Sequence, residues 1–271
     1  MSAKRSQILL VIGALALFVL LYIAPKAAPA AQQKEESHAP AAVSTNATLD
    51  VYAGTAAKNL DPVKKQQFDK LIAAKSYDSL TTFWDRFKRP DLASVYVEEK
   101  AKQANTADIW YKAGNRYYYA VQFSQDKTEI PVLYQCAMRC FNKTLALDPK
   151  NTDAKIMLAS CYVEGTQSPM EGISKLKEVE KTDSNNVKLQ LTFAFFSVKS
   201  GQLDKAISRF KKVIEIDSNY IEAYLHLADA YERQSNTAMT IEMLQKYSAR
   251  TNDVTARLKI EKYIKQLKEQ H

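Results

Sequence analysis

Hydrophobic and polar positions follow the same order in three separate parts of the chain. The three stretches are TLALDPKNTDAKIMLASCY at 144–162, VEKTDSNNVKLQLTFAFFS at 179–197 and VIEIDSNYIEAYLHLADAY at 213–231. In each stretch an acidic residue and a turn former stand in the middle, and small and apolar residues follow at fixed offsets. A spacing of 34 or 35 residues between copies predicts one repeated pair of helices, which needs neighbours to bury its apolar face.

A related pattern occurs upstream, in the segment DIWYKAGNRYYYA at 108–120. Trp110, Gly114 and Tyr117 fall on one face of a helix at spacings of four and three residues. The glycine leaves room for a neighbouring helix to come close. This face is therefore predicted to be a packing face.

An insertion of about eleven residues, QFSQDKTEIPVLYQ and its surroundings, separates this helix from its partner. It predicts either longer helices or an added loop in this unit. Thr128, ahead of Glu129 and Pro131, indicates where the second helix starts. Pro149 indicates where it stops.

These units resemble the tetratricopeptide repeat (TPR), a helix–turn–helix unit of 34 residues that carries Trp, Gly, Tyr, Ala, Phe and Pro at fixed positions. The resemblance implies an all-α fold, a solenoid of antiparallel helix pairs, with units at about 107–151, 152–186, 187–220 and 221–254. Ser184 and Ser218 depart from the family's proline, which weakens the stop signal. The remaining matches are Ala137, Phe141, Leu158, Ala159, Tyr162, Gly172, Leu176, Phe193, Ala194, Gly201, Ala206, Phe210, Tyr224, Leu227, Ala228, Tyr231, Thr240 and Leu244.

Weaker helical patterns flank the four units on both sides. Residues 59–106 contain a degenerate TPR-like unit, with Trp84, Ala93 and Val97 as its packing residues. Residues 255–271 form an amphipathic helix, which is expected to cap the solenoid because a terminal unit needs a polar outer face. The apolar residues of this helix are Leu258, Ile260, Tyr263, Ile264 and Leu267.

The N-terminal 24 residues have the pattern of a membrane segment. Residues 8–24, ILLVIGALALFVLLYIA, carry no charge, and seventeen residues of helix span about 25 Å. Two interpretations stay open: an uncleaved anchor within 1–24, or a signal peptide cleaved at a site such as Ala28-Pro29-Ala30. The apolar run is longer than the usual core of a signal peptide, which favours the anchor.

The charges around this segment predict its orientation. Lys4 and Arg5 precede it, whereas Lys26 and Lys34 follow at wider spacing, so the N-terminus is expected in the cytoplasm. The C-terminal part is then extracytoplasmic, which in a Gram-negative bacterium means the periplasm. Residues 25–58 contain eleven alanines and three prolines without an apolar period, and they predict a flexible linker.

The chain of 271 residues has 46% hydrophobic residues and a net charge of +8, a globular composition with a modest basic excess. Lysines alternate with acidic residues along the helical segments, which is typical of a solvated surface. A basic surface can also meet nucleic acid or anionic lipid. A protein that binds such a surface from the cytoplasm is therefore the alternative function.

Residues that could carry chemistry are few. Three cysteines, without a CxxC pair or a histidine cluster, predict neither a disulfide framework nor a metal site; a bridge between Cys136 and Cys140 stays open but would be strained. His226 is expected to be a partly buried helical residue. No phosphate-binding loop, nucleophile motif or nucleotide fingerprint occurs. A non-enzymatic protein without a cofactor is expected.

The TPR resemblance implies that the first helix of each pair lines a concave groove. The expected groove has an apolar middle, which suits a protein or peptide partner with hydrophobic anchors. Asn115 and Lys188 are the only matches to the TPR set that grips the C-terminal carboxylate of heat-shock chaperones, so that mode is not expected. The layout is similar to single-span TPR proteins of bacterial secretion and envelope assembly, and self-association stays open. The candidate groove residues are Tyr111, Asn115, Tyr118, Ile156, Ser160, Lys188, Leu191, Phe195, Leu225 and Asp229.

Overall fold

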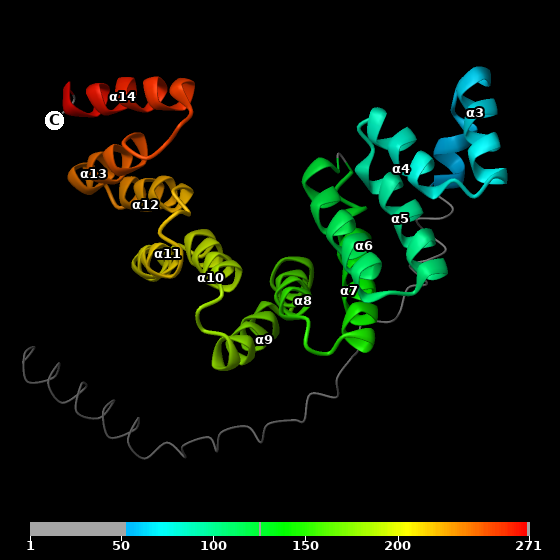
Figure 1. Cartoon of the computed structure of the whole chain (residues 1–271), viewed down its shortest axis with the longest axis horizontal. Coiled ribbons are helices and arrows are strands. Elements are labelled where there is room, and N and C mark those ends of the chain that lie inside the picture. Colours follow the sequence, from blue (N-terminus) through cyan, green and yellow to red (C-terminus); the bar gives the residue numbers. More distant parts are fainter. Residues whose placement is uncertain (1–52, 125, 270–271) are drawn as a thin grey trace, which may run out of the picture. The chain divides into compact units, whose positions relative to one another are not determined.

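The computed structural model describes residues 53–124 and 126–269, and this part of the chain consists of helices and the turns between them (Figure 1). The predicted all-α fold is confirmed for these residues. Residues 53–58 are helical. The elements that follow are α3 (Pro62–Ala73), α4 (Tyr77–Arg86), α5 (Pro90–Ala104), α6 (Ala107–Ala120), the short η1 (Val121–Phe123), α7 (Ile130–Leu147), α8 (Thr152–Gly165), α9 (Pro169–Thr182), α10 (Val187–Lys199), α11 (Leu203–Ile216), α12 (Glu222–Arg233), α13 (Thr237–Ser248) and α14 (Val254–Glu269).

Each described helix packs mainly against the helix before it and the helix after it. The helices α6, α8 and α10 also contact one another in sequence, skipping the helix in between. This stacking of helix pairs is the arrangement of a TPR-like solenoid. It follows from the amphipathic pattern, because each pair can cover its apolar face only with the next pair.

The buried side chains form four clusters, each shared by consecutive helices. One joins residues 53–58 with α3 to α5, a second joins α5 to α8, a third joins α8 to α10 and the fourth joins α10 to α14. Tyr117 and Phe141, which the repeat pattern assigned to packing, are buried to within 1% in the second cluster. Gly114 lies against the Phe141 ring, as the pattern of small residues predicted.

The turn within a pair has the same geometry in the third and fourth units. Gly201 and Ser235, 34 positions apart, both have left-handed backbones, with φ of +72° and +59°. The next residue donates its backbone N–H to the carbonyl five positions back: Gln202 to Ser197 at 2.8 Å and Asn236 to Tyr231 at 2.9 Å. This is a helix C-cap that satisfies otherwise unpaired carbonyls. Ser197 and Tyr231 therefore occupy equivalent places in successive units.

The turn between pairs explains the acidic residue and turn former in the repeated stretches. Asn151 and Asn186 cap α8 and α10, each accepting a hydrogen bond from the backbone N–H three residues later, at 2.9 and 3.0 Å. Asp148 and Asp183, three residues earlier, each accept a hydrogen bond from the amide of the asparagine that follows. In the third copy Tyr220 stands at the asparagine position, and α12 has no side-chain cap.

The insertion in the first unit forms both a loop and a longer helix. The chain leaves α6 through η1, and α7 then runs for 18 residues. Asp126 organises the loop, because its carboxylate accepts hydrogen bonds from the backbone N–H and the hydroxyl of Thr128 at 2.8 and 2.7 Å. The helix starts at Ile130, two residues after Thr128, with Glu129 as its N-cap residue.

A buried ion pair ties α5, α6 and α7 together. Glu98 on α5 is 4% exposed, and Arg139 on α7 contacts both of its carboxylate oxygens at 3.0 and 2.7 Å. The Tyr117 hydroxyl on α6 donates to the same carboxylate at 2.8 Å. Burial would lower the pKa of Arg139, but its hydrogen bonds to Glu98 raise that pKa above the ordinary value. Arg139 is therefore fully charged.

The three cysteines lie in this region of the helical core. Cys136, Cys140 and Cys161 are buried, and no disulfide joins them. Burial raises the pKa of the Cys140 and Cys161 thiols. They therefore pack as small, protonated side chains.

The predicted anchor and signal peptide, at residues 8–24, lie outside the described residues. The predicted linker reached Lys58, but residues 53–58 are helical, and Ala53 and Ala57 pack with Phe68 in the first cluster. Alanines at i and i+4 can share a buried helical face, so their abundance did not mark a linker here. Among the described helices, none has the length and apolar character needed to cross a bilayer.

The final helix α14 packs against α13 through part of the predicted apolar set. Ile264 and Leu267 are buried, and Ile260 and Tyr263 are partly buried against the same cluster. Leu258 is 61% exposed and does not belong to the packed face. One side of α14 covers the solenoid while its other side carries the charged residues.

Candidate partner-binding face

The first helices of the four units, α6, α8, α10 and α12, share one continuous face, here called the first-helix face. Side chains connect α6 to α8 and α10, and others connect α10 to α12. The face therefore runs across all four units. The predicted groove residues are described along it, from α6 to α12.

The first polar contact of this face joins three helices through Tyr111. The Lys188 ammonium on α10 donates to the Tyr111 hydroxyl on α6 at 2.6 Å, and lies 5.3 Å from the centre of its ring. Asp153 on α8 completes the group, with oxygens 3.5 Å from both the Tyr111 hydroxyl and the Lys188 ammonium. These three side chains bind one another, so Lys188 already has partners within the protein.

A second polar group joins the same three helices nearer their C-terminal ends. The Tyr118 hydroxyl on α6 donates to the Glu164 carboxylate on α8 at 2.5 Å, and Lys199 on α10 pairs with the other oxygen of that carboxylate at 3.2 Å. Tyr134 on α7 also donates to it, at 3.4 Å. Burial, and then the bond to Glu164, raise the pKa of Tyr118, which therefore stays protonated.

An apolar patch lies between α10 and α12. Phe195 is 44% exposed, and its ring centre lies 5.5 Å from that of Phe210 and 4.9 Å from that of His226. Leu191, one turn before Phe195 on α10, and Leu225, next to His226 on α12, are half-buried and pack against the core cluster that contains Phe210. Burial lowers the pKa of His226 and outweighs the nearby Asp229 and Glu222 carboxylates, which would raise it. The imidazole is therefore neutral at pH 7. An exposed aromatic ring held by neighbouring rings is a ready anchor for a partner.

The end of the face on α12 is charged. Asp229 is exposed and accepts a hydrogen bond from Arg233, four residues later, at 2.9 Å. At the other end, Asn115 on α6 is half-buried beside a hollow of about 610 Å³, whose apolar border includes Tyr119 and Phe123. Asn115 is thus separated from the apolar patch by the two polar groups.

Two predicted groove residues do not reach the surface. Ile156 is 0% exposed and Ser160 is 3% exposed. Both lie on α8, which is packed between α6 and α10 as well as against α7 and α9. The Ser160 hydroxyl donates to the Ile156 carbonyl at 3.0 Å instead of facing a partner. The helix has too few uncovered sides to offer both residues to a ligand.

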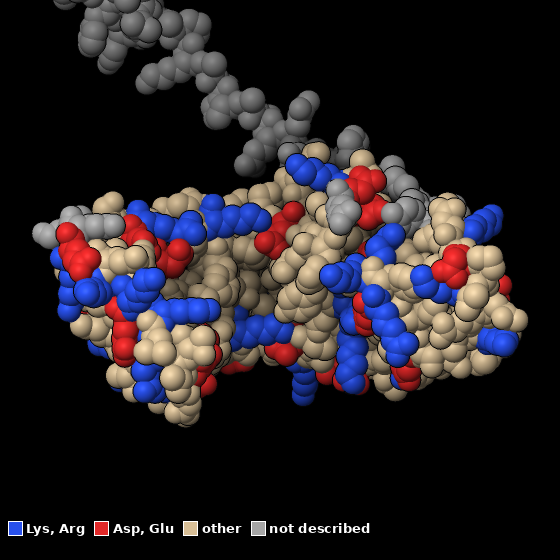
Figure 2. Space-filling model, turned by 90° about the horizontal axis from the view of Figure 1, so that it is seen from above, with Lys and Arg blue, Asp and Glu red and all other residues tan. Residues whose placement is uncertain are grey.

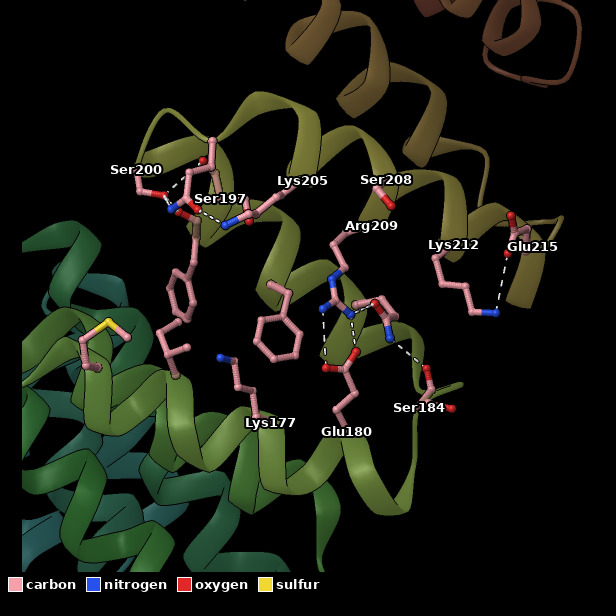
Figure 3. A pocket seen from close by; sticks show the side chains of 16 residues that line it. Lys177, Glu180, Ser184, Ser197, Ser200, Lys205, Ser208, Arg209, Lys212 and Glu215 are labelled. Atoms are coloured by element: carbon pink, nitrogen blue, oxygen red, sulfur yellow. Dashed lines mark hydrogen bonds and ion pairs between the residues drawn. The ribbon is translucent and has the colours of Figure 1, made fainter.

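A cleft on the opposite side of α10 was not predicted (Figure 3). It has a volume of about 760 Å³, with walls from α9 and α11 and a floor from α10. The side chains of Phe193 and Phe196 form part of the floor. Phe193 points away from Leu191 and Phe195, because positions two residues apart on a helix lie about 200° apart. Phe196, one position after Phe195, lies about 100° from it around the helix axis. The only signal in the sequence was that α10 is apolar on both faces.

Metal binding has no candidate site among residues 53–124 and 126–269. In that part of the chain, no group of three or more histidine, cysteine, aspartate or glutamate side chains could hold a metal ion. The half-buried His226 contacts aromatic rings. The described surfaces suit binding by shape and side-chain contact.

Comparisons with known proteins agree with this geometry. The model of the TPR repeat matches residues 198–235. The crystal structure of TTC0263, a TPR protein of Thermus thermophilus, is 17% identical, covers 68% of this chain and 95% of its own, and superimposes with a TM-score of 0.51. Comparison with curated proteins finds no match.

Two further solved structures are similar over comparable lengths. YrrB, described as a TPR protein with an unusual peptide-binding site, is 22% identical over 72% of this chain and 97% of its own, with a TM-score of 0.42. A MamA structure from Desulfovibrio magneticus RS-1 is 21% identical over 66% of this chain and 97% of its own, with a TM-score of 0.45.

Proposed function

We propose that this protein is a membrane-anchored, non-enzymatic adaptor that holds a protein partner on its first-helix face. The observation that carries the proposal is the apolar patch around Phe195. Its ring is 44% exposed yet fixed between Phe210 and His226, so a partner can bury it at little cost in side-chain entropy. A partner segment with a hydrophobic anchor fits this patch.

The polar groups of the same face support this choice of anchor point. Lys188 and Lys199 are engaged with groups on neighbouring helices, so a partner gains little by replacing those contacts. Affinity then comes from apolar contact at Phe195, with Leu191 and Leu225 as its border. The proposed partner is an extended or helical segment that places an apolar side chain there.

The alternative function is that of a cytoplasmic protein that binds nucleic acid or lipid. The distribution of surface charge does not favour it. On the face shown in Figure 2, lysine and arginine side chains are interspersed with aspartate and glutamate. Many of the lysines and arginines form ion pairs, about half of them within one helix. A continuous basic stripe, which phosphate backbones favour, is not seen on this face.

Phe195→Ser is expected to weaken partner binding about thirtyfold, because loss of a central aromatic anchor costs roughly 2 kcal/mol of binding energy. Proteins that co-purify with the full chain from a detergent extract would be identified and quantified, and binding of the main one measured with purified components. Leu258→Ser is the control, since Leu258 is similarly exposed on another helix. Equal partner binding by wild type and Phe195→Ser would contradict a role for this face.

The membrane anchor predicts where the helical part resides. If residues 8–24 span the membrane with the N-terminus inside, protease added to spheroplasts should digest the helical part, and protease added to intact cells should not. A cytoplasmic marker protein must survive in both samples. Survival of the helical part in spheroplasts would contradict the extracytoplasmic location. Release of that part in soluble form would favour cleavage after the signal peptide.

A further inference from the structure

The cleft between α9 and α11 is built from stripes of side chains on three helices (Figure 3). On α11 the lining runs from Gln202, just before the helix, to Glu215, which corresponds to about 20 Å at 1.5 Å per residue. An extended peptide of about six residues covers that length at 3.3 Å per residue. The cleft is therefore long enough for a short linear segment of a protein.

A bridge between the two walls crosses the cleft near its middle (Figure 3). Arg209 on α11 pairs with Glu180 on α9, donates to the Gln190 side chain at 2.7 Å, and lies 4.5 Å from the centre of the Phe193 ring. The hydrogen bonds from Arg209 lower the pKa of Glu180, which is ionised at neutral pH. The charges of Arg209 and Glu180 thus neutralise each other and fix the shape of the cleft.

The remaining charges of the cleft leave a positive excess. Lys212 pairs with Glu215 at 3.5 Å. Lys177 and Lys205, both exposed, lie on opposite walls, and among the described residues neither forms an ion pair with a carboxylate. Lys205 donates to the neutral Gln202 side chain at 2.6 Å. Lys177 also attracts the Glu180 carboxylate, which Arg209 already pairs. The lining of the cleft thus carries four basic and two acidic side chains, an excess of two positive charges.

We infer that this cleft is a second docking site, which binds a short acidic segment of a partner protein. An apolar side chain of the segment lies against the half-buried Phe196, and its carboxylates pair with Lys177 and Lys205 from opposite walls. The phosphates of a nucleic acid carry the same sign of charge as an acidic segment, so an oligonucleotide is included in the test below. The site is separate from the Phe195 patch, because Phe195 does not line the cleft and both cleft phenylalanines are turned at least 100° from it around the axis of α10.

A fluorescent peptide that alternates acidic pairs with phenylalanine, DEFDEFDE, serves as the probe. Its binding to the full chain in a non-ionic detergent would be followed by fluorescence anisotropy at low salt. The test variant is Lys177→Glu with Lys205→Glu. The control is Lys259→Glu with Lys262→Glu, which makes the same change of net charge at exposed positions of α14. Both variants should retain the circular dichroism of the wild type.

The Lys177 and Lys205 double variant is expected to bind the probe about tenfold more weakly, because each reversal turns an attraction into a repulsion. The α14 control should stay within twofold of wild type, and Phe195→Ser should bind the probe normally. A probe with serine in place of phenylalanine should bind at least fivefold more weakly.

Several results would overturn the inference. These are no binding of the probe by the wild type, equal losses in both double variants, or equal binding of the serine probe. Tighter binding of a single-stranded oligonucleotide than of the peptide at the same salt, if lost on reversing Lys177 and Lys205, would identify the cleft as a phosphate-binding surface instead. Because Phe195→Ser is measured in parallel, failure here is distinguishable from failure of the proposed function.

Discussion

Arg139→Met is expected to lower the free energy of unfolding by about 3–5 kcal/mol, the usual cost of leaving one partner of a buried ion pair uncompensated. Glu98 would keep its carboxylate in a site that is 4% exposed, with the Tyr117 hydroxyl as its remaining partner among the contacts described above. The Glu98 side chain is only 5% exposed, so water offers its carboxylate little compensation. The large effect comes from this trapped charge.

Replacing the other partner of the ion pair, Glu98, should lower the free energy of unfolding by less. In Glu98→Gln the amide keeps the shape of the side chain, and the Arg139 side chain, which is 26% exposed, can reach water. A loss of about 1–3 kcal/mol is expected. The variants would be compared by thermal and urea unfolding of the full chain in detergent. The double variant Glu98→Leu, Arg139→Met should recover much of the stability, because no buried charge is then left unpaired.

The asymmetry between the two single variants is the decisive measurement. If Glu98→Gln were as damaging as Arg139→Met, the network would act through its geometry and not through the buried carboxylate. If neither lowered stability by more than about 1 kcal/mol, the ion pair would be worth no more than an exposed one.

Gly172→Ala is the second substitution for which a large effect is expected, with a loss of about 1–3 kcal/mol. A Cβ at this position would lie 2.4 Å from the carbonyl oxygen of Ala159 and 2.6 Å from the Val163 side chain. Alanine normally favours a helix by about 1 kcal/mol over glycine. Here the clash wins, because the nearest atom belongs to the backbone of α8 and cannot rotate away.

The damage should be local. In a solenoid the stability is a sum over units and their interfaces, so hydrogen exchange is expected to accelerate first in α8 and α9. Gly54→Ala is the matched control, because a Cβ there meets nothing within 4 Å and residues 53–58 are helical. That control should be neutral or slightly stabilising. If hydrogen exchange in α8 and α9 were unchanged in Gly172→Ala, the two helices would have moved apart to admit the Cβ without losing stability. That result would contradict the prediction.

Much of the fold was predictable because each structural rule left a local trace. The Asp148 and Asn151 pair marks a turn and a cap within four residues, and Gly201 marks a left-handed cap. Helix spacing then assigned residues such as Tyr117 and Phe141 to the core. Equivalent positions in successive units could be aligned without knowing how the units pack.

The candidate site was harder to predict, because exposure depends on neighbours that are distant in sequence. Ile156 and Ser160 stand at the same repeat positions as Leu191 and Phe195, yet α6 and α10 cover α8 from both sides. The α9–α11 cleft was missed for a related reason. Its walls come from different units, so Lys177 and Lys205 each look like ordinary surface residues until the two helices stand opposite each other.

The link between Lys188 and Tyr111 joins residues 77 positions apart, whereas the main helix contacts are between neighbours along the chain. Tension applied between the two termini would therefore load most interfaces in series, and the weakest would open first. From α6 to α10, this link lies in parallel with the packed interfaces and shares the force. The middle of the molecule should be mechanically stiffer than its ends, which suits a partner held beside α10 while the rest of the protein is stretched.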